Sequence, residues 1–124
     1  MKTHLITHGP LLDQNAIESL RALSPDDGDG FLKEILTIFL EDTPARIAEL
    51  HNFRTSGNPD GFIRAAHSIK GSSSNIGAIE LRSVAAELEN QARQHGITQI
   101  NDHLNKVEAA YARLQAILIE MLSN

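Results

Sequence analysis

Several residue types are missing or scarce in this chain, and each absence narrows what the protein can be. There is no cysteine among the 124 residues, which excludes disulfides and thiolate chemistry and is compatible with a cytoplasmic location. Aromatic residues make up only 4% of the sequence. The core must therefore be built from aliphatic side chains, a composition that favours packed helices over a sheet.

Positive charge and long apolar runs are scarce as well. The formal net charge is −5 and no basic stripe is present, which argues against a nucleic-acid-binding protein. No run approaches the roughly 18 apolar residues of a membrane span, and the first ten residues lack the apolar core of a signal peptide. We expect one domain over residues 12–124, preceded by a flexible lead-in over residues 1–11.

The apolar residues that are present recur at helical spacing. A short helix is expected over about 13–23, followed by a long one over about 30–55. Pro44 interrupts the long one, because proline lacks a backbone donor and clashes with the preceding turn. A kink just before the proline is favoured by the continuous apolar face. The alternative is a break at which Asp42 or Thr43 caps a new helix.

Three more helices are expected over about 59–74, 78–95 and 99–122, with Asn58 and Thr98 as N-caps. Four long amphipathic helices with short links can bury their apolar faces only against each other. The sequence therefore predicts an all-α fold, an up-and-down antiparallel four-helix bundle with an extra short N-terminal helix.

His67 is an exposed histidine with an adjacent cation and a cleared approach. On a helical projection it lies roughly 140° from the centre of the apolar stripe of its helix. Lys70 lies one turn on, at the flank of that stripe. Gly71 lies one turn from His67 on the solvent side. Because a helical glycine costs about 1 kcal/mol relative to alanine, its presence indicates that a side chain there would crowd the imidazole. The stripe itself comprises Phe62, Ala65, Ala66, Ile69, Ser73 and Ile76.

This combination is suited to phosphoryl transfer. A neutral imidazole can attack a phosphoryl donor through one ring nitrogen while a partner holds the other. Lys70 can offset the negative charge of the bound phosphoryl group. The chain has no glycine-rich nucleotide loop, so we expect it to require a protein donor and a protein acceptor rather than ATP.

The run His67-Ser68-Ile69-Lys70-Gly71-Ser72-Ser73, followed by Gly77-Ala78, resembles the signature of histidine phosphotransfer (HPt) domains. The resemblance extends over residues 88–93 and over residues 31–50. It implies a phosphorelay intermediate in two-component signalling. In such a relay, His67 accepts a phosphoryl group from the aspartate of a receiver domain and passes it to another receiver.

The resemblance also implies roles for individual residues. Lys70 stabilises the phosphorylated state, and Gly71 leaves room for the receiver. Glu89 matches a Gln or Glu position that hydrogen-bonds the histidine, with Arg93 one turn later. No metal site or cofactor is expected in the domain, since the Mg²⁺ belongs to the receiver. The receiver is expected to dock on the short first helix and the exposed face of the histidine helix, at positions drawn from Ile17, Leu20, Ile63, Ser68 and Ser74.

The implied partners are response-regulator receiver domains, a hybrid sensor histidine kinase, or both, with no contact to nucleic acid or membrane. We expect a monomeric phosphocarrier rather than an enzyme, either free-standing or the C-terminal part of a hybrid kinase. Two other interpretations remain open. One is a helical protein-interaction module in which His67 is incidental. The other is the phosphoacceptor domain of a chemotaxis-type kinase, in which an ATP-binding domain from elsewhere phosphorylates His67.

Overall fold

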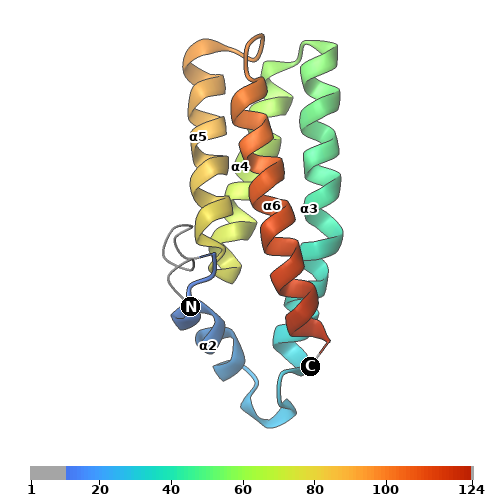
Figure 1. Cartoon of the computed structure of the whole chain (residues 1–124), viewed down its shortest axis with the longest axis vertical. Coiled ribbons are helices and arrows are strands. Elements are labelled where there is room, and N and C mark those ends of the chain that lie inside the picture. The colour runs from blue at the N-terminus through green and yellow to red at the C-terminus, as the bar shows by residue number, and fades with distance from the viewer. Residues whose placement is uncertain (1–10, 124) are drawn as a thin grey trace, which may run out of the picture.

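Five α-helices and one 3₁₀ turn follow each other in a computed structural model of the protein, which describes residues 11–123 (Figure 1). The predicted lead-in over residues 1–11 lies outside the described residues except for Leu11. The elements are α2 (Gln14–Ala22), the 3₁₀ turn η1 (Pro25–Asp27), α3 (Gly30–Ser56), α4 (Pro59–Ile76), α5 (Ile79–His95) and α6 (Asn101–Leu122).

Helices α3 to α6 run side by side and alternate in direction, and α2 lies at one end of them (Figure 1). This is the predicted up-and-down bundle with an additional short helix. Each of the four long helices buries one face against its neighbours, as short connections between antiparallel helices require. No helix among residues 11–123 is both long enough and apolar enough to cross a membrane.

Local capping chemistry sets several of the helix ends. The Asp13 side chain accepts from the Asn15 backbone N–H at 2.9 Å, and Asn58 accepts from Gly61 N–H at 3.0 Å. Gly77 ends α4 with φ of +73°, a left-handed conformation that favours glycine. A Cβ at Gly77 would also lie 2.5 Å from the Ala16 Cβ, so glycine lets α2 approach the α4–α5 junction.

Two predicted helix ends were wrong. Thr98 does not cap α6, which begins at Asn101 with Ile100 in the N-cap position and no side-chain cap. The reason is burial: Ile97 and Ile100 are 7% and 2% exposed, and the chain turns them into the core before the helix begins. Helix α4 also continues to Ile76, two residues beyond the predicted end, because Ile76 completes its buried face.

Pro44 lies inside a single continuous helix, so the alternative of a helix break at the proline is excluded. Thr43 is 1% exposed and its buried hydroxyl has no hydrogen-bond partner, so it caps no new helix. A proline cannot donate to the carbonyl four residues earlier, here that of Leu40. Tyr111 of α6 reaches this carbonyl instead, with its Oη 3.4 Å from the oxygen. A contact from another helix therefore replaces the donor that the proline lacks.

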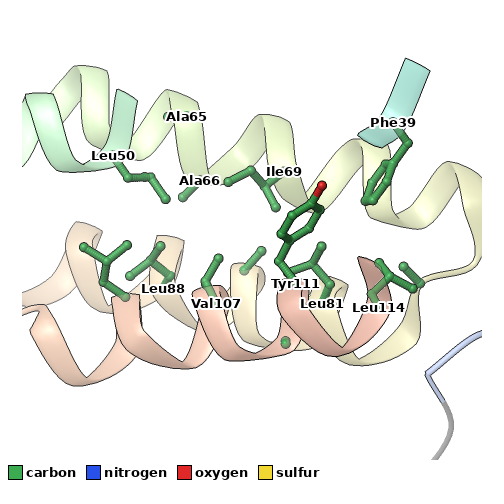
Figure 2. Close-up of a cluster of buried hydrophobic side chains, with 14 of the residues drawn as sticks. Phe39, Leu50, Ala65, Ala66, Ile69, Leu81, Leu88, Val107, Tyr111 and Leu114 are labelled. Carbon is green, nitrogen blue, oxygen red and sulfur yellow. The ribbon is translucent and has the colours of Figure 1, made fainter. Parts of the chain in front are cut away.

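The core is aliphatic, as the composition predicts, and its side chains meet between the helices (Figure 2). The six-residue stripe predicted for α4 is buried along its whole length, at 3% exposure or less. In Figure 2 the Tyr111 ring rises from α6 with its hydroxyl directed away from that helix. Leu23 lies just after α2 and is 69% exposed, because the chain leaves the bundle there.

The start of the described chain is tied to the α4–α5 junction. Leu12 pairs with Ala78 in an isolated antiparallel bridge, and the Asp13 N–H donates to the Gly77 carbonyl at 2.8 Å. Ile17 of α2 is 1% exposed and belongs to the core. These contacts place α2 beside the C-terminal end of α4, which is the helix that carries His67.

Candidate functional site

His67 projects from α4 into solvent, with 62% of its side chain exposed. Its Nδ1 lies 3.1 Å and 3.2 Å from the two carboxylate oxygens of Glu89 on α5. An ionised carboxylate can only accept hydrogen bonds, so Nδ1 carries the proton and donates it. The tautomer inferred from this partner leaves Nε2 as the unprotonated, nucleophilic nitrogen.

Glu89 is the buried centre of a small charge cluster. Its side chain is 8% exposed, and besides His67 it binds Lys70 Nζ at 3.0 Å and Arg93 Nη2 at 2.9 Å. Burial raises the pKa of the Glu89 carboxyl, but the hydrogen bonds from Arg93, Lys70 and His67 outweigh burial and lower the pKa below its usual value. Glu89 is therefore a carboxylate at neutral pH.

The residues brought together here include four from the predicted site: His67, Lys70, Glu89 and Arg93. Arg93 lies one turn after Glu89 on α5, and Lys70 lies one turn after His67 on α4. The two helices pack closely along their length. The pair His67 and Lys70 on α4 therefore meets the pair Glu89 and Arg93 on α5. Glu89 accepts hydrogen bonds from the other three side chains.

Gly71 has no structural reason to be glycine within the domain. A Cβ built there would meet no atom within 4 Å, apart from its own helix backbone and chain neighbours. Gly61, on the same helix, is different: its Cβ would lie 2.6 Å from the Phe53 ring, so glycine is needed for α3–α4 packing. The space above Gly71 is open solvent beside His67. Packing among the described residues therefore does not explain why this position is glycine.

An apolar hollow of about 400 Å³ lies between α2, α3 and α4. Leu20, Ile35, Ile38, Ser72 and Ile76 are among the residues that line it. Sequence reasoning missed Ile35 and Ile38. The sequence did offer a signal for Ile38, because this apolar residue lies out of phase with the buried face of α3. In the structure its side chain is 53% exposed. We call this feature the apolar hollow.

The other predicted docking residues differ in how accessible they are. Ile17 was a wrong choice, because its side chain is 1% exposed and is held in the core. Leu20 lines the apolar hollow, Ile63 is half-buried, and Ser68 is exposed. Ser74 is exposed and its Oγ accepts a hydrogen bond from Arg82 Nε at 2.9 Å. Residues 11–123 contain no group of three or more His, Cys, Asp or Glu side chains placed to hold a metal ion.

Comparisons with known proteins point to one family. A model of the Hpt domain family matches residues 34–117. Histidine-containing phosphotransfer protein B (HptB) from Pseudomonas aeruginosa PAO1 is 27% identical, with a TM-score of 0.83 over 93% of this chain and 96% of that chain. No match was found among curated proteins.

Two plant structures share the fold. A putative histidine-containing phosphotransfer protein from rice is 22% identical, with a TM-score of 0.82 over 98% of this chain and 85% of that one. MtHPt2, a histidine-containing phosphotransfer protein from Medicago truncatula, is 21% identical, with a TM-score of 0.79 over 98% and 82%. The family match covers well over half of the sequence and includes both helices of the charge cluster. The chain therefore belongs to the Hpt family of histidine phosphotransfer domains, which serve as phosphorelay intermediates and are not kinase cores.

Proposed function

We propose that this domain carries its phosphoryl group on Nε2 of His67, taking it from the aspartyl phosphate of one receiver domain and delivering it to the aspartate of another. The contact between His67 Nδ1 and Glu89 is the observation that supports this, since it leaves Nε2 unprotonated and exposed. The Nε2 lone pair forms the N–P bond while the P–O bond to the aspartate breaks. The aspartate leaves as a carboxylate, and the reverse step restores both groups.

Glu89 is the positioning residue of this reaction. It holds the His67 ring in one tautomer and one orientation, so that Nε2 faces an incoming donor. Phosphorylation at Nε2 places positive charge on the ring, and a carboxylate against Nδ1 stabilises that charge. The lowered pKa keeps Glu89 ionised for this role.

Lys70 provides the charge that a phosphoryl group on His67 needs. Its side chain is 31% exposed, and its Nζ is held at 3.0 Å from Glu89 Oε1, in the cluster that contains His67. A phosphoryl group on Nε2 brings additional negative charge to this cluster, and a flexible lysine can bind it. Arg93 continues to hold Glu89 when Lys70 changes partner.

The receiver docks over Gly71 and the apolar hollow. Leu20 and Ile38 provide apolar contact area on one side of His67, and the missing side chain at Gly71 lets the partner approach the imidazole. Ser68 is also exposed on α4, next to His67 in the sequence. Ile63 and Ser74 flank that face along the same helix. The receiver contributes the Mg²⁺ of the reaction, and this domain contributes the nucleophile.

All side chains of the proposed site come from one chain, so a monomer is sufficient. The domain acts in the cytoplasm as a carrier that contributes no ATP-binding site. Its parent is a hybrid sensor kinase or a free-standing carrier, and its partners are that kinase or other receivers.

The test compares two histidines of the same chain. Wild-type protein is incubated with a panel of receiver domains phosphorylated with radioactive phosphate, and the labelled product is treated with acid and with base. We expect label that is lost in acid and survives base, as phosphohistidine does. His67→Gln should abolish labelling. His51→Gln is the matched control, because His51 is also exposed and bound to a carboxylate, Glu108 at 2.9 Å.

Each outcome decides between the interpretations. Labelling of the His67→Gln variant would refute His67 as the phosphoacceptor. No labelling of the wild type by any receiver would favour the interaction-module interpretation. Labelling that requires ATP and a kinase ATP-binding domain, with no receiver, would indicate the phosphoacceptor domain of a chemotaxis-type kinase.

A further inference from the structure

A second hollow, of about 540 Å³, lies on the other flank of His67, along the outer face of α5 against α4. Three cationic side chains line it, Lys70, Arg82 and Arg93, together with two carboxylates, Glu87 and Glu89. We call it the basic hollow. Ser83 and Ala86 also line it, and their small side chains leave the space open.

The electrostatic balance of the basic hollow is positive although the whole chain has a net charge of −5. Glu89 is buried and already binds both Lys70 and Arg93. Glu87 accepts a hydrogen bond from the neutral Gln91 at 2.8 Å and keeps its charge, so three cations face two carboxylates in the hollow. Arg82 donates through Nε to the neutral Ser74 hydroxyl, a contact that leaves its charge uncompensated. The surface of an acidic protein therefore carries a local positive site next to its exposed histidine.

The two hollows lie on opposite sides of the histidine. Lys70, which lines the basic hollow, and Ser72, which lines the apolar hollow, follow His67 by three and five residues. On a helix these offsets lie on opposite sides of the His67 direction. Ser74 lies two turns after His67 on nearly the same line, so its contact with Arg82 brings that cation beside the exposed face of α4. A protein that covers His67 and the apolar hollow therefore has the basic hollow at its edge.

We infer that the basic hollow is a second docking subsite for the receiver domain and binds an acidic segment of the receiver that flanks its phosphorylation site. This inference rests on the proposed function. Carboxylates of the segment pair with Arg82 and with Arg93, whose side chain is 58% exposed while its Nε and Nη2 donate to Glu89. Charge pairs at an interface rim mainly steer the encounter and select among partners. Receivers without acidic residues at this edge are then disfavoured, and Arg82 becomes a specificity-determining residue.

The test uses Arg82, because it does not contact Glu89 in the structure, and compares Arg82→Gln with Arg113→Gln. Arg113 is the matched control, since it is similarly exposed and forms its ion pair with Glu80 on the α5–α6 face. The rate of phosphoryl transfer from a phosphorylated receiver is measured against receiver concentration at about 50 mM and about 1 M NaCl. Circular dichroism and thermal unfolding confirm that each variant is folded.

We expect Arg82→Gln to raise the receiver concentration for half-maximal rate by about threefold at low salt, and Arg82→Glu by about tenfold. The maximal rate should not change, and at high salt the variants should approach the wild type. Arg113→Gln should match the wild type throughout. A wild-type concentration dependence for both Arg82 variants would overturn the inference, as would an equal loss at both salt concentrations.

The failure of this inference is separate from that of the proposed function. Transfer to wild-type protein with no effect at Arg82 removes only the docking subsite. Absence of transfer to wild-type protein removes the proposed function and this inference with it. A loss confined to the maximal rate would show that Arg82 acts on the reacting groups, which also overturns the docking role.

Discussion

Tyr111 of α6 donates a hydrogen bond to the carbonyl of Leu40 in α3, 71 residues earlier, at an oxygen-to-oxygen distance of 3.4 Å. This carbonyl is the one that Pro44 leaves without its helical donor. The Tyr111 ring is 7% exposed and packs against Phe39 with ring centroids 6.3 Å apart. The contact explains how a proline is accommodated within a 27-residue helix.

The first prediction follows from this contact. Tyr111→Phe should destabilise the domain by about 0.5–1.5 kcal/mol, because a partly buried carbonyl loses its donor. In a Pro44→Ala background the loss should be smaller, since alanine restores the backbone N–H, and Pro44 is exposed so the change leaves no cavity. Urea unfolding of the four proteins forms a double-mutant cycle. Equal losses in both backgrounds would show that Tyr111 does not compensate for the proline.

Gly71 yields a prediction that separates the stability of the fold from phosphoryl transfer. Gly71→Ala should stabilise the fold by about 0.5–1 kcal/mol, because helical alanine is favoured and its Cβ enters open space. Gly71→Gln should leave the fold intact but slow phosphoryl transfer by about tenfold or more, since its side chain fills the approach to His67. Gly61→Ala is the control: its Cβ meets the Phe53 ring, so it should destabilise. Normal transfer by Gly71→Gln would remove the argument about access.

The apolar hollow can be tested through Ile38. Ile38→Ser should change the free energy of unfolding by less than about 0.5 kcal/mol, because the side chain is mostly exposed. The same change should weaken receiver docking by about fivefold or more if the hollow is the contact surface. Ile119→Ser is matched in residue type and exposure, at 51%, and lies on α6. Equal transfer by the Ile38 and Ile119 variants, measured against receiver concentration, would place the docking surface elsewhere.

The charge cluster predicts a pH dependence of stability. Glu89 has a lower pKa in the folded domain than the ordinary value of 4.5, so its contribution is present above that value and is lost as pH falls through the folded pKa. Wild-type protein should therefore lose more stability between about pH 5 and pH 3 than Glu89→Gln does. Thermal unfolding across this range measures the difference. Parallel profiles for the two proteins would show that the carboxylate is not stabilised by its neighbours.

Two substitutions at Glu89 distinguish the contribution of its hydrogen bond to the rate of phosphoryl transfer from the contribution of its charge. Glu89→Gln retains an acceptor for His67 Nδ1 and loses the carboxylate, whereas Glu89→Ala loses both. We expect the alanine variant to slow transfer by about tenfold or more relative to the glutamine variant, because the ring loses its fixed tautomer. Transfer rates at saturating receiver provide the measurement. Equal rates for the two variants would show that Glu89 does not orient the imidazole.

Much of the fold followed from local pattern. The buried face of α4 was predicted residue by residue, because helical geometry fixes which side chains share a face. Asn58 was predicted as an N-cap for the same local reason, and it is found there. The errors occur where distant contacts override local signals. Thr98 is a good capping residue, but burial of Ile97 and Ile100 moved the start of α6 beyond it.

The sequence by itself determined that the domain is helical, that His67 lies on a solvent-facing side of its helix, and that Lys70 and Gly71 lie one turn away. These are relations between residues three or four positions apart, and helix geometry alone sets them. Spacing did not determine the rest: Glu89 was expected beside His67 only through the family resemblance, and the tertiary structure decided that contact, the support of α3 at Pro44 by Tyr111 and the burial of Ile17. The physical reason is that burial and the pairing of charges depend on which helices pack together, and no local spacing specifies that.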